Sequence, residues 1–242
     1  MAQHMTQESH SVRTRLLEAL TEGVFADAQR LPAESELAAQ LGISRTQLRD
    51  SLATLEREGF ITRRQGIGTV INRHVLSVAN RMDIEVEFMD MVRQSGKTPG
   101  VAFVRTEMTA CEAHAAGCLK IEQGEMILKV SRLVTADGAP AVYCEDHVPY
   151  GLIKRPILGA NFNRPIFDFL REFCETEPFM DLTDVHPSAA DASLAALFRV
   201  SQGTPLLFLD EVDYDIEGKP ILYSAQYYIE GGVSHTVMRK KL

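Results

Sequence analysis

Apolar residues recur at helical spacing in three short segments near the start of the chain. The pattern predicts helices over residues 11–23, 34–41 and 45–58, because leucine or alanine side chains three and four positions apart share one face of each segment. Gly42 ends the second helix, and Ser44 is a good N-cap for the third. Two helices joined by so short a turn form a helix-turn-helix.

A pair of short strand patterns follows these helices. Residues 60–64 and 69–72 flank the sequence Gln65-Gly66-Ile67-Gly68, which predicts a β-hairpin with glycines at its tip, a wing. Residues 9–73 therefore form a predicted winged helix-turn-helix domain. We expect residues 74–83 to be a polar linker and residues 84–242 to form a second domain.

The second domain contains an internal repeat about 80 residues apart. Each copy has a helical pattern, a strand pattern, a glycine turn two residues before a proline, and another strand pattern. The paired segments are 111–124 with 190–203, 126–135 with 205–214, Asp137-Gly138 with Glu217-Gly218, and 141–148 with 221–228.

Two such units side by side predict a mostly antiparallel sheet with helices on one face, so we expect an α+β fold. Four further elements belong to this domain in the prediction. They are helices over residues 84–94 and 166–174, a strand over residues 182–185, and a last strand near residues 235–239.

The composition is that of an ordinary globular protein with 45% hydrophobic and 24% charged residues, and 242 residues suffice for two modest cores. No apolar run approaches the ~20 residues of a membrane span, and the polar N-terminus does not resemble a secretory signal. Four cysteines without a CxxC pattern are typical of reduced thiols. We expect a cytoplasmic protein that uses no membrane and no cofactor.

The charge is unevenly distributed along the chain. The formal net charge is −8, yet residues 1–73 are neutral and residues 43–73 carry six arginines against three acids. The second domain accounts for the whole negative charge. A small basic surface on an acidic body indicates a protein that touches DNA at one end.

The start of the third helix carries the candidate DNA contacts. Arg45 and Arg49 are suited to guanine, Gln47 to adenine, and Thr46 and Thr69 to phosphate. The alternative is that these arginines are ordinary solvated helix charges. The candidate contacts are Ser44, Arg45, Thr46, Gln47, Arg49, Gln65, Gly66, Gly68 and Thr69.

Residues 31–71 resemble the signature of the GntR superfamily of bacterial transcription regulators. The shared skeleton is Leu31-Pro32, Glu36-Leu37-Ala38, Leu41-Gly42, Ser44-Arg45, Arg49, Leu52, Leu55, Glu58-Gly59 and Gly66-Ile67-Gly68-Thr69. The resemblance implies sequence-specific DNA binding. One position departs from it: Ser35 stands where the family usually carries an arginine that contacts DNA.

The second domain resembles the UTRA ligand-binding domain of the HutC-like branch, whose fold is similar to that of chorismate lyase. The resemblance implies an effector-binding and dimerisation domain. It is carried by the motifs GKTP (96–99), Arg132-Leu133, DGAP (137–140), EDHVP (145–149), PIFDFL (165–170) and DxEGKP…YY (215–228).

Arg132 is the main candidate in this domain because it shares the apolar face of its strand with Leu128 and Val130. A buried arginine needs a partner, which is either an internal ion pair with Glu145 or Glu211, or an anionic ligand. The resemblance favours a ligand, since the matching arginine of sugar-phosphate-responsive members contacts the phosphate.

Most companions of that arginine are replaced here. Gly100 and Val101 replace the family's serine pair, and Val134 replaces its second arginine. Cys144 and Leu222 replace two acids, Pro165 replaces a serine, and Phe167 replaces a tyrosine. Only Arg132 and Tyr228 match the family. These replacements describe a drier pocket suited to a small non-phosphorylated organic anion. The candidate effector contacts are Arg132, Tyr228, Gly100, Cys144, Glu145, Phe167 and Leu222.

The sequence thus predicts a ligand-responsive repressor that binds a palindromic operator as a homodimer and is released by its effector. Two alternatives are an enzyme with a lyase-like domain and a ligand-independent DNA-binding dimer. We expect no catalytic residues and no metal site. Cys111, His114 and Cys118 lie on one face of a predicted helix, which is more typical of a buried helix face than of a metal site. The acidic stretch 210–215 is more typical of the solvated side of a strand than of a cation site.

Overall fold

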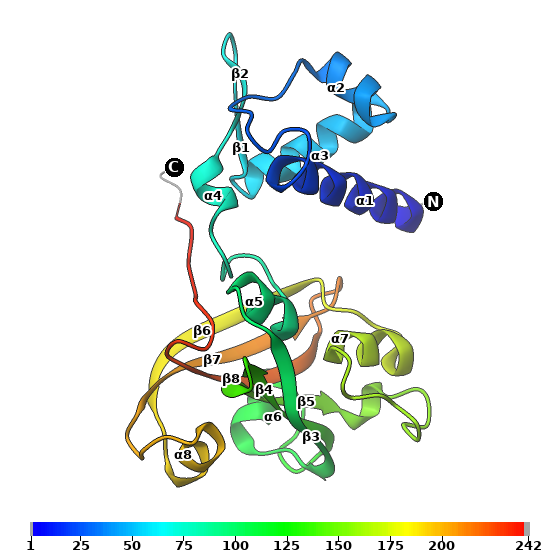
Figure 1. The fold of residues 1–242 in the computed structure, drawn as a ribbon. Helices are drawn as coiled ribbons and strands as arrows, with labels where there is room; N and C mark the ends of the chain where they lie inside the picture. The colour runs from blue at the N-terminus through cyan, green and yellow to red at the C-terminus, as the bar shows by residue number, and fades with distance from the viewer. Residues whose placement is uncertain (1, 240–242) are drawn as a thin grey trace. The chain divides into compact units, whose positions relative to one another are not determined.

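The computed structural model describes residues 2–239 and divides into two compact units, the first ending at Val78 and the second beginning at Ala79 (Figure 1). The division lies within the predicted linker 74–83, but much of that segment is ordered structure. Helix α4 (Arg73–Leu76) belongs to the first unit, while Asn80 and Arg81 are buried in the second.

The first unit is built on helices α1 (Ala2–Thr21), α2 (Glu34–Leu41) and α3 (Arg45–Arg57). Helix α1 begins nine residues before the predicted start, and the other two helices match the prediction closely. Gly42 has a positive φ of 65° and ends α2 in the left-handed conformation. The predicted leucine faces meet in a core whose fully buried members are Leu16, Leu20, Leu37, Leu48, Leu52 and Leu55.

The wing is the predicted hairpin of β1 (Ile61–Arg64) and β2 (Gly68–Ile71). Arg63 anchors it to α3 through an ion pair with Glu56 at 2.8 Å. After the wing, Arg73 donates hydrogen bonds to the backbone carbonyls of Leu20, Phe25 and Ala28, which join the end of this unit to its first helix.

The second unit contains a six-stranded antiparallel sheet in the order β3-β4-β5-β8-β7-β6. The strands are β3 (Pro99–Ala110), β4 (Met126–Ala136), β5 (Ala139–Pro149), β6 (Met180–Ala189), β7 (Pro205–Tyr214) and β8 (Pro220–Ile229). The repeat is confirmed and includes one more strand per copy than the sequence indicated. Strand β3 was not predicted, and β6 is longer than residues 182–185.

The sheet order makes the two copies symmetric about its centre. Strands β3, β4 and β5 correspond to β6, β7 and β8, and the central pair β5–β8 joins the copies. Glu145 of β5 pairs with Ala225 of β8, and Ala225 is the residue that corresponds to Glu145 in the second copy of the repeat, 80 residues later. The local two-fold axis therefore passes between these two residues.

Helices cover both faces of this sheet, so the expectation of helices on one face was wrong (Figure 1). Helices α5 (Phe88–Gln94) and α7 (Ile166–Phe169, continued by the π-helical turn Leu170–Cys174) pack on one face. Helices α6 (Ala113–Leu119) and α8 (Ala192–Phe198) pack on the other. The central strands are buried on both sides, which requires a cover on each face.

Two further expectations were wrong in detail. Helix α5 begins at Phe88 rather than residue 84, because Glu87 caps it by accepting a hydrogen bond from the Met89 amide at 2.8 Å. The described part of residues 235–239 forms no strand; Thr236 makes a single parallel bridge to Arg81. Among the described residues, no helix is long and apolar enough to cross a membrane.

Candidate functional site

The N-terminus of α3 is closed by a capping box. Gln47 donates its backbone N–H to the Ser44 hydroxyl at 3.2 Å, and its side-chain oxygen accepts the Ser44 backbone N–H at 3.1 Å. Two of the orphan donors at the helix start are satisfied in this way. The side-chain oxygen of Gln47 makes this capping contact, and its role in reading adenine stays a prediction.

The exposed side of α3 presents the other predicted contacts. Arg45 and Thr46 are solvent-exposed. Arg49 is also exposed, but its Nε lies 2.7 Å from a carboxylate oxygen of Glu34 in α2. This ion pair ties the two helices of the motif together and orients the guanidinium. Ser35, at the position that differs from the family, is exposed on α2.

The wing tip is exposed as well. Gln65, Gly66 and Gly68 are open to solvent, and Thr69 is half-buried. Gly66 and Gly68 have φ values of 78° and 89°, which L side chains rarely adopt, so the tight turn depends on these glycines. The helix and the wing both leave polar groups available for a partner.

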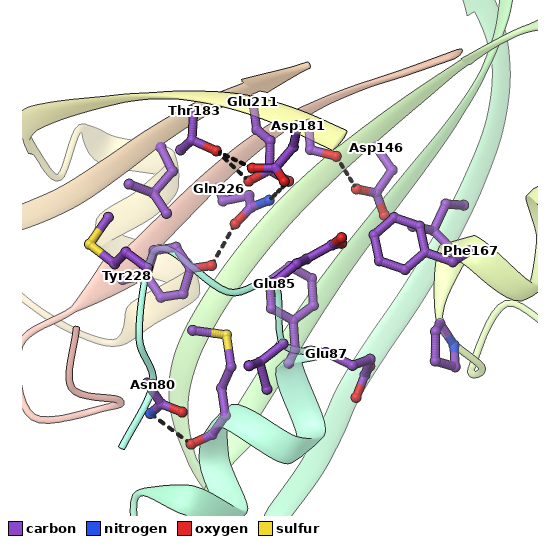
Figure 2. Close-up of a pocket in the computed structure, with 18 of the residues that line it drawn as sticks. Asn80, Glu85, Glu87, Asp146, Phe167, Asp181, Thr183, Glu211, Gln226 and Tyr228 are labelled. Carbon is purple, nitrogen blue, oxygen red and sulfur yellow. Dashed lines mark hydrogen bonds between the residues drawn. The ribbon is translucent and has the colours of Figure 1, made fainter. Parts of the chain in front are cut away.

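A pocket lies in the second unit, on the sheet face covered by α5 and α7 (Figure 2). Its volume is about 90 Å³, measured as the space open to the centres of water molecules. By this measure one water needs about 10–15 Å³, so the pocket has room for a small metabolite. Its walls are strands β4 to β8, the segment of residues 80–88, and the start of α7.

The structure brings four of the seven predicted effector residues together. Arg132, Phe167, Leu222 and Tyr228 line the pocket. The other three do not line it: Gly100 lies on β3 with Thr135 in the place of any side chain, Cys144 is fully buried, and Glu145 is on the opposite face of the sheet. There Glu145 accepts a hydrogen bond from the Tyr143 hydroxyl at 2.8 Å.

Arg132 is buried, with 3% of its surface exposed. Its Nη2 donates to the backbone carbonyls of Phe162 and Arg164, at 3.1 Å each. Within residues 2–239 it forms no ion pair with Glu145 or Glu211, so that interpretation was wrong, and its buried Nε has no hydrogen-bond partner. The guanidinium is held in place by carbonyl groups and retains donor capacity.

Five carboxylates stand among the mostly apolar residues of the pocket wall, and the sequence analysis did not predict them. They come from the segment before α5 and from strands of both copies of the repeat (Figure 2). The acidic stretch on β7 is therefore not simply a solvated strand face: Glu211 lines the pocket and Asp213 is fully buried. The lining carboxylates are Glu85, Glu87, Asp146, Asp181 and Glu211.

These carboxylates raise one another's pKa values. Burial, with repulsion from other acids including Asp181, raises the pKa of Glu211 to about 7. Burial and the charges of Glu211 and Glu85 raise the pKa of Asp213 to about 9. The pKa of Glu85 rises to about 7 through loss of hydration on its pocket side and the charges of Asp181 and Glu211, although this rim residue remains exposed to solvent. Asp213 is therefore protonated at neutral pH, and Glu85 and Glu211 are protonated in part.

A hydrogen-bonded chain joins the polar groups at this end of the pocket (Figure 2). Tyr228 Oη lies 2.5 Å from Gln226 Oε1, and Gln226 Nε2 donates to Glu211 Oε1 at 2.9 Å. Thr183 Oγ1 is 2.8 Å from Glu211 and 3.0 Å from Asp181. The Thr183 hydroxyl has one proton and can donate to only one of these two carboxyl groups. The other contact is a hydrogen bond only if that carboxyl group, Asp181 or Glu211, is itself protonated.

The helical stripe of Cys111, His114 and Cys118 is only partly a buried helix face. Cys111 is buried, but His114 and Cys118 meet Asp210 on the sheet face opposite the pocket, with all three ligand atoms within 4.8 Å of one another. His114 Nε2 lies 2.8 Å from Asp210 Oδ2. The contact is an exposed histidine–carboxylate pair with a nearby thiol.

Comparisons with known proteins agree with the two-unit division. Residues 8–71 match the model of bacterial regulatory proteins of the gntR family, and residues 94–230 match the UTRA domain model. The chain is similar to the HTH-type transcriptional repressor NagR of Bacillus subtilis, with 23% identity covering 90% of this chain and 89% of that protein. It is 27% identical to the HTH-type transcriptional regulator GgaR of Escherichia coli, covering 86% and 82% of the two chains.

A solved structure has the same fold over nearly the whole length. The possible transcriptional regulator YydK of Bacillus subtilis matches with a TM-score of 0.74 and 20% identity, covering 96% of this chain and 99% of that one. The likeness covers the fold of both units.

Proposed function

This chain belongs to the GntR family of bacterial transcription regulators and carries a UTRA domain, and from this premise we propose that it is an effector-controlled repressor that binds a palindromic operator. The observation that carries the proposal is the combination, in one chain, of an exposed helix-turn-helix surface with a ligand-sized pocket in the second unit. Its family consists of regulators rather than enzymes.

DNA recognition is assigned to the start of α3 and to the wing. Arg45 is exposed at the helix start, where side chains reach base edges in the major groove. Arg49 reads bases or phosphates either with its Nη groups or after release from Glu34. The glycine-built wing tip allows backbone to approach the adjacent groove.

We propose a homodimer because one recognition helix reads only a few base pairs, and two half-sites are needed for adequate specificity. The sheet of the second unit offers an edge for assembly. Strand β6 is an edge strand that exposes Met180, Leu182 and Val185 to more than half of their full extent. Exposed apolar side chains on a sheet edge support an interface with a second copy.

Effector binding is coupled to DNA through the chain itself in this proposal. Residues 80–88 line the pocket and follow directly after Val78, where the DNA-binding unit ends. A ligand that fixes this segment changes the connection between the units, and it shifts DNA affinity by its differential binding to the two arrangements. An anionic group of the effector is assigned to Arg132, the arginine on the pocket wall.

The test is selection of an operator from random DNA with the full chain, followed by binding measurements on variants. We expect a two-fold symmetric site, loss of specific binding in Arg45→Ala, and unchanged binding in the control Arg105→Ala, which removes an exposed arginine on β3. An asymmetric site bound by one chain, or an Arg45→Ala variant that binds like the wild type, would overturn the proposal.

A further inference from the structure

The two copies of the repeat place opposite charges at equivalent positions of the pocket. Arg132 on β4 corresponds to Glu211 on β7, 79 residues later, and their strand neighbours Val104 and Thr183 correspond in the same way. Both side chains line the pocket. Arg132 interacts electrostatically with Glu87 and Asp146, whereas the charges that act on Glu85 and Glu211 are those of other acids, so the two sides of the pocket differ in charge.

Building on the proposed function, we propose that the effector is a small zwitterion, with its anionic carboxylate at Arg132 and its ammonium group among Glu85, Asp181 and Glu211. The repressor and dimer assignments do not depend on this step. It specifies the chemical class of ligand that the pocket accepts.

Charge balance is the first argument for the ammonium group. Within residues 2–239, no lysine or arginine forms an ion pair with Glu85, Asp181 or Glu211. Of the two arginines on the pocket wall, Arg81 is already paired with Asp83. Burial lowers the pKa of His235, the histidine of the wall, so it is neutral. A ligand with only negative charge would face five carboxyl groups and, besides Arg81, a single guanidinium, Arg132, which already interacts with Asp146 and Glu87.

Unsatisfied buried atoms are the second argument. Asp213 is 0% exposed, and neither of its carboxyl oxygens has a hydrogen-bond partner. It lies behind Glu211 on the same face of β7 and interacts electrostatically with Glu211, Glu85 and Asp181. At the other end, Arg132 Nε is buried without a partner. Arg132 Nε thus offers a buried donor on the pocket wall, and Asp213 places a further unpaired acid next to the lining residue Glu211.

A metal ion fits this cluster less well than an organic cation. Among the described residues, the only histidine, cysteine or carboxylate group that converges at metal-binding distances is His114, Cys118 and Asp210, on the opposite face. Glu85, Asp181 and Glu211 are not part of such a group. Asp181 and Glu211 both contact Thr183, and neighbouring carboxyl oxygens suit an ammonium group with its three N–H donors.

The sheet geometry sets the size of the ligand. Strands β4 and β7 are separated by β5 and β8, so the backbones that carry Arg132 and Glu211 are about 14 Å apart at roughly 4.8 Å per strand. Both side chains extend into that space and shorten the gap. A ligand with several carbons between its charges spans it better than an α-amino acid with a short side chain.

The experiment measures thermal stabilisation and calorimetric binding of the full chain with matched probes: 5-aminopentanoate and lysine as zwitterions, pentanoate and glutarate as anions, cadaverine as a diamine, and Ca²⁺ or Mn²⁺ alone. We expect the zwitterions to raise Tm most at about 10 mM and near pH 7.5, since a ligand stabilises by its affinity for the folded state. Glu211→Gln, Asp181→Asn and Arg132→Gln should each weaken their binding about tenfold or more. Glu107→Gln, an exposed acid on β3, is the matched control and should bind normally.

Three results would overturn the inference: glutarate stabilising more than every zwitterion, a metal ion acting alone through Glu211, or no amine-bearing probe shifting Tm. Asp181→Asn decides the case if Glu211→Gln does not fold. DNA release separates this from the proposed function. If glutarate released the operator through Arg132, the repressor proposal would stand and the zwitterion proposal would be wrong. If zwitterions bound without any effect on DNA binding, the zwitterion proposal would stand and effector control of DNA binding would be wrong.

Discussion

The buried acid Asp213 should make the protein less stable as the pH rises. Its pKa is about 9 in the folded state because of burial and the neighbouring acids, compared with an ordinary value of 3.8. The folded protein therefore holds a proton that the unfolded chain has released over this interval. Because the folded state binds more protons, the free energy of unfolding falls as pH increases through the window from about 4 to about 9.

The size of the effect follows from this proton difference. One extra proton corresponds to at most about 1.4 kcal/mol per pH unit. Asp213→Asn has no such proton, so its stability relative to the wild type should increase by about 1–3 kcal/mol between roughly pH 5.5 and 7.5 after allowance for coupling to Glu211. The predicted quantity is the change with pH in the difference between the two unfolding free energies. Any cost of burying the asparagine amide that does not depend on pH therefore cancels.

The assay is urea unfolding of the wild type, Asp213→Asn and the exposed-site control Glu107→Gln at several pH values. The control should run parallel to the wild type. If the curve for Asp213→Asn also runs parallel, Asp213 is not protonated in the folded protein, and the description of the carboxyl cluster as proton-sharing is wrong.

Three further predictions concern the DNA-binding unit and assembly. Light scattering should give a dimer at micromolar concentration, and a monomer with one chain per operator would contradict the half-site argument. Arg45→Ala should cost about 1–3 kcal/mol in operator binding with little change in binding to random DNA, whereas equal losses on both would indicate a phosphate contact. Ser44→Ala should destabilise the unit by about 1 kcal/mol through loss of the α3 cap, and an unchanged Tm would refute the capping role.

Elements with strong local signals were predicted well from the sequence. The helices and wing of the first unit follow from leucine spacing, a serine cap and glycine turns, all of which act between neighbours in the chain. The paired strands of the repeat carry near-continuous apolar patterns with glycine turns. Strand β3 was missed because it is an edge strand with many exposed polar residues, and its strand pairing depends on β4.

The pocket was predicted only in part: Arg132 followed from the apolar face of its strand, and Phe167, Leu222 and Tyr228 from the family resemblance. The carboxylates come from segments distant in sequence, and nothing local to Glu85 or Asp181 indicates that they meet. A signal did exist for two residues: Ser224 and Gln226 alternate with Leu222 and Tyr228 and so share their face of β8. The repeat also contained the position of Glu211, as the counterpart of Arg132.

The duplicated sheet explains how one fold can produce a polar pocket without a large insertion. A two-fold repeat places equivalent residues on opposite sides of its axis. If the residues at the positions of Arg132 and Glu211 were both apolar or had the same charge, the two sides of the pocket would be chemically alike. Here the two copies have diverged to arginine and glutamate, and the pocket has acquired a direction. The segment that crosses its carboxyl half carries Glu85 and leads directly back to Val78. In the proposed mode of binding, the ammonium group contacts the part of the chain that follows the DNA-binding unit, and Arg132 sets the orientation of the ligand by holding its carboxylate.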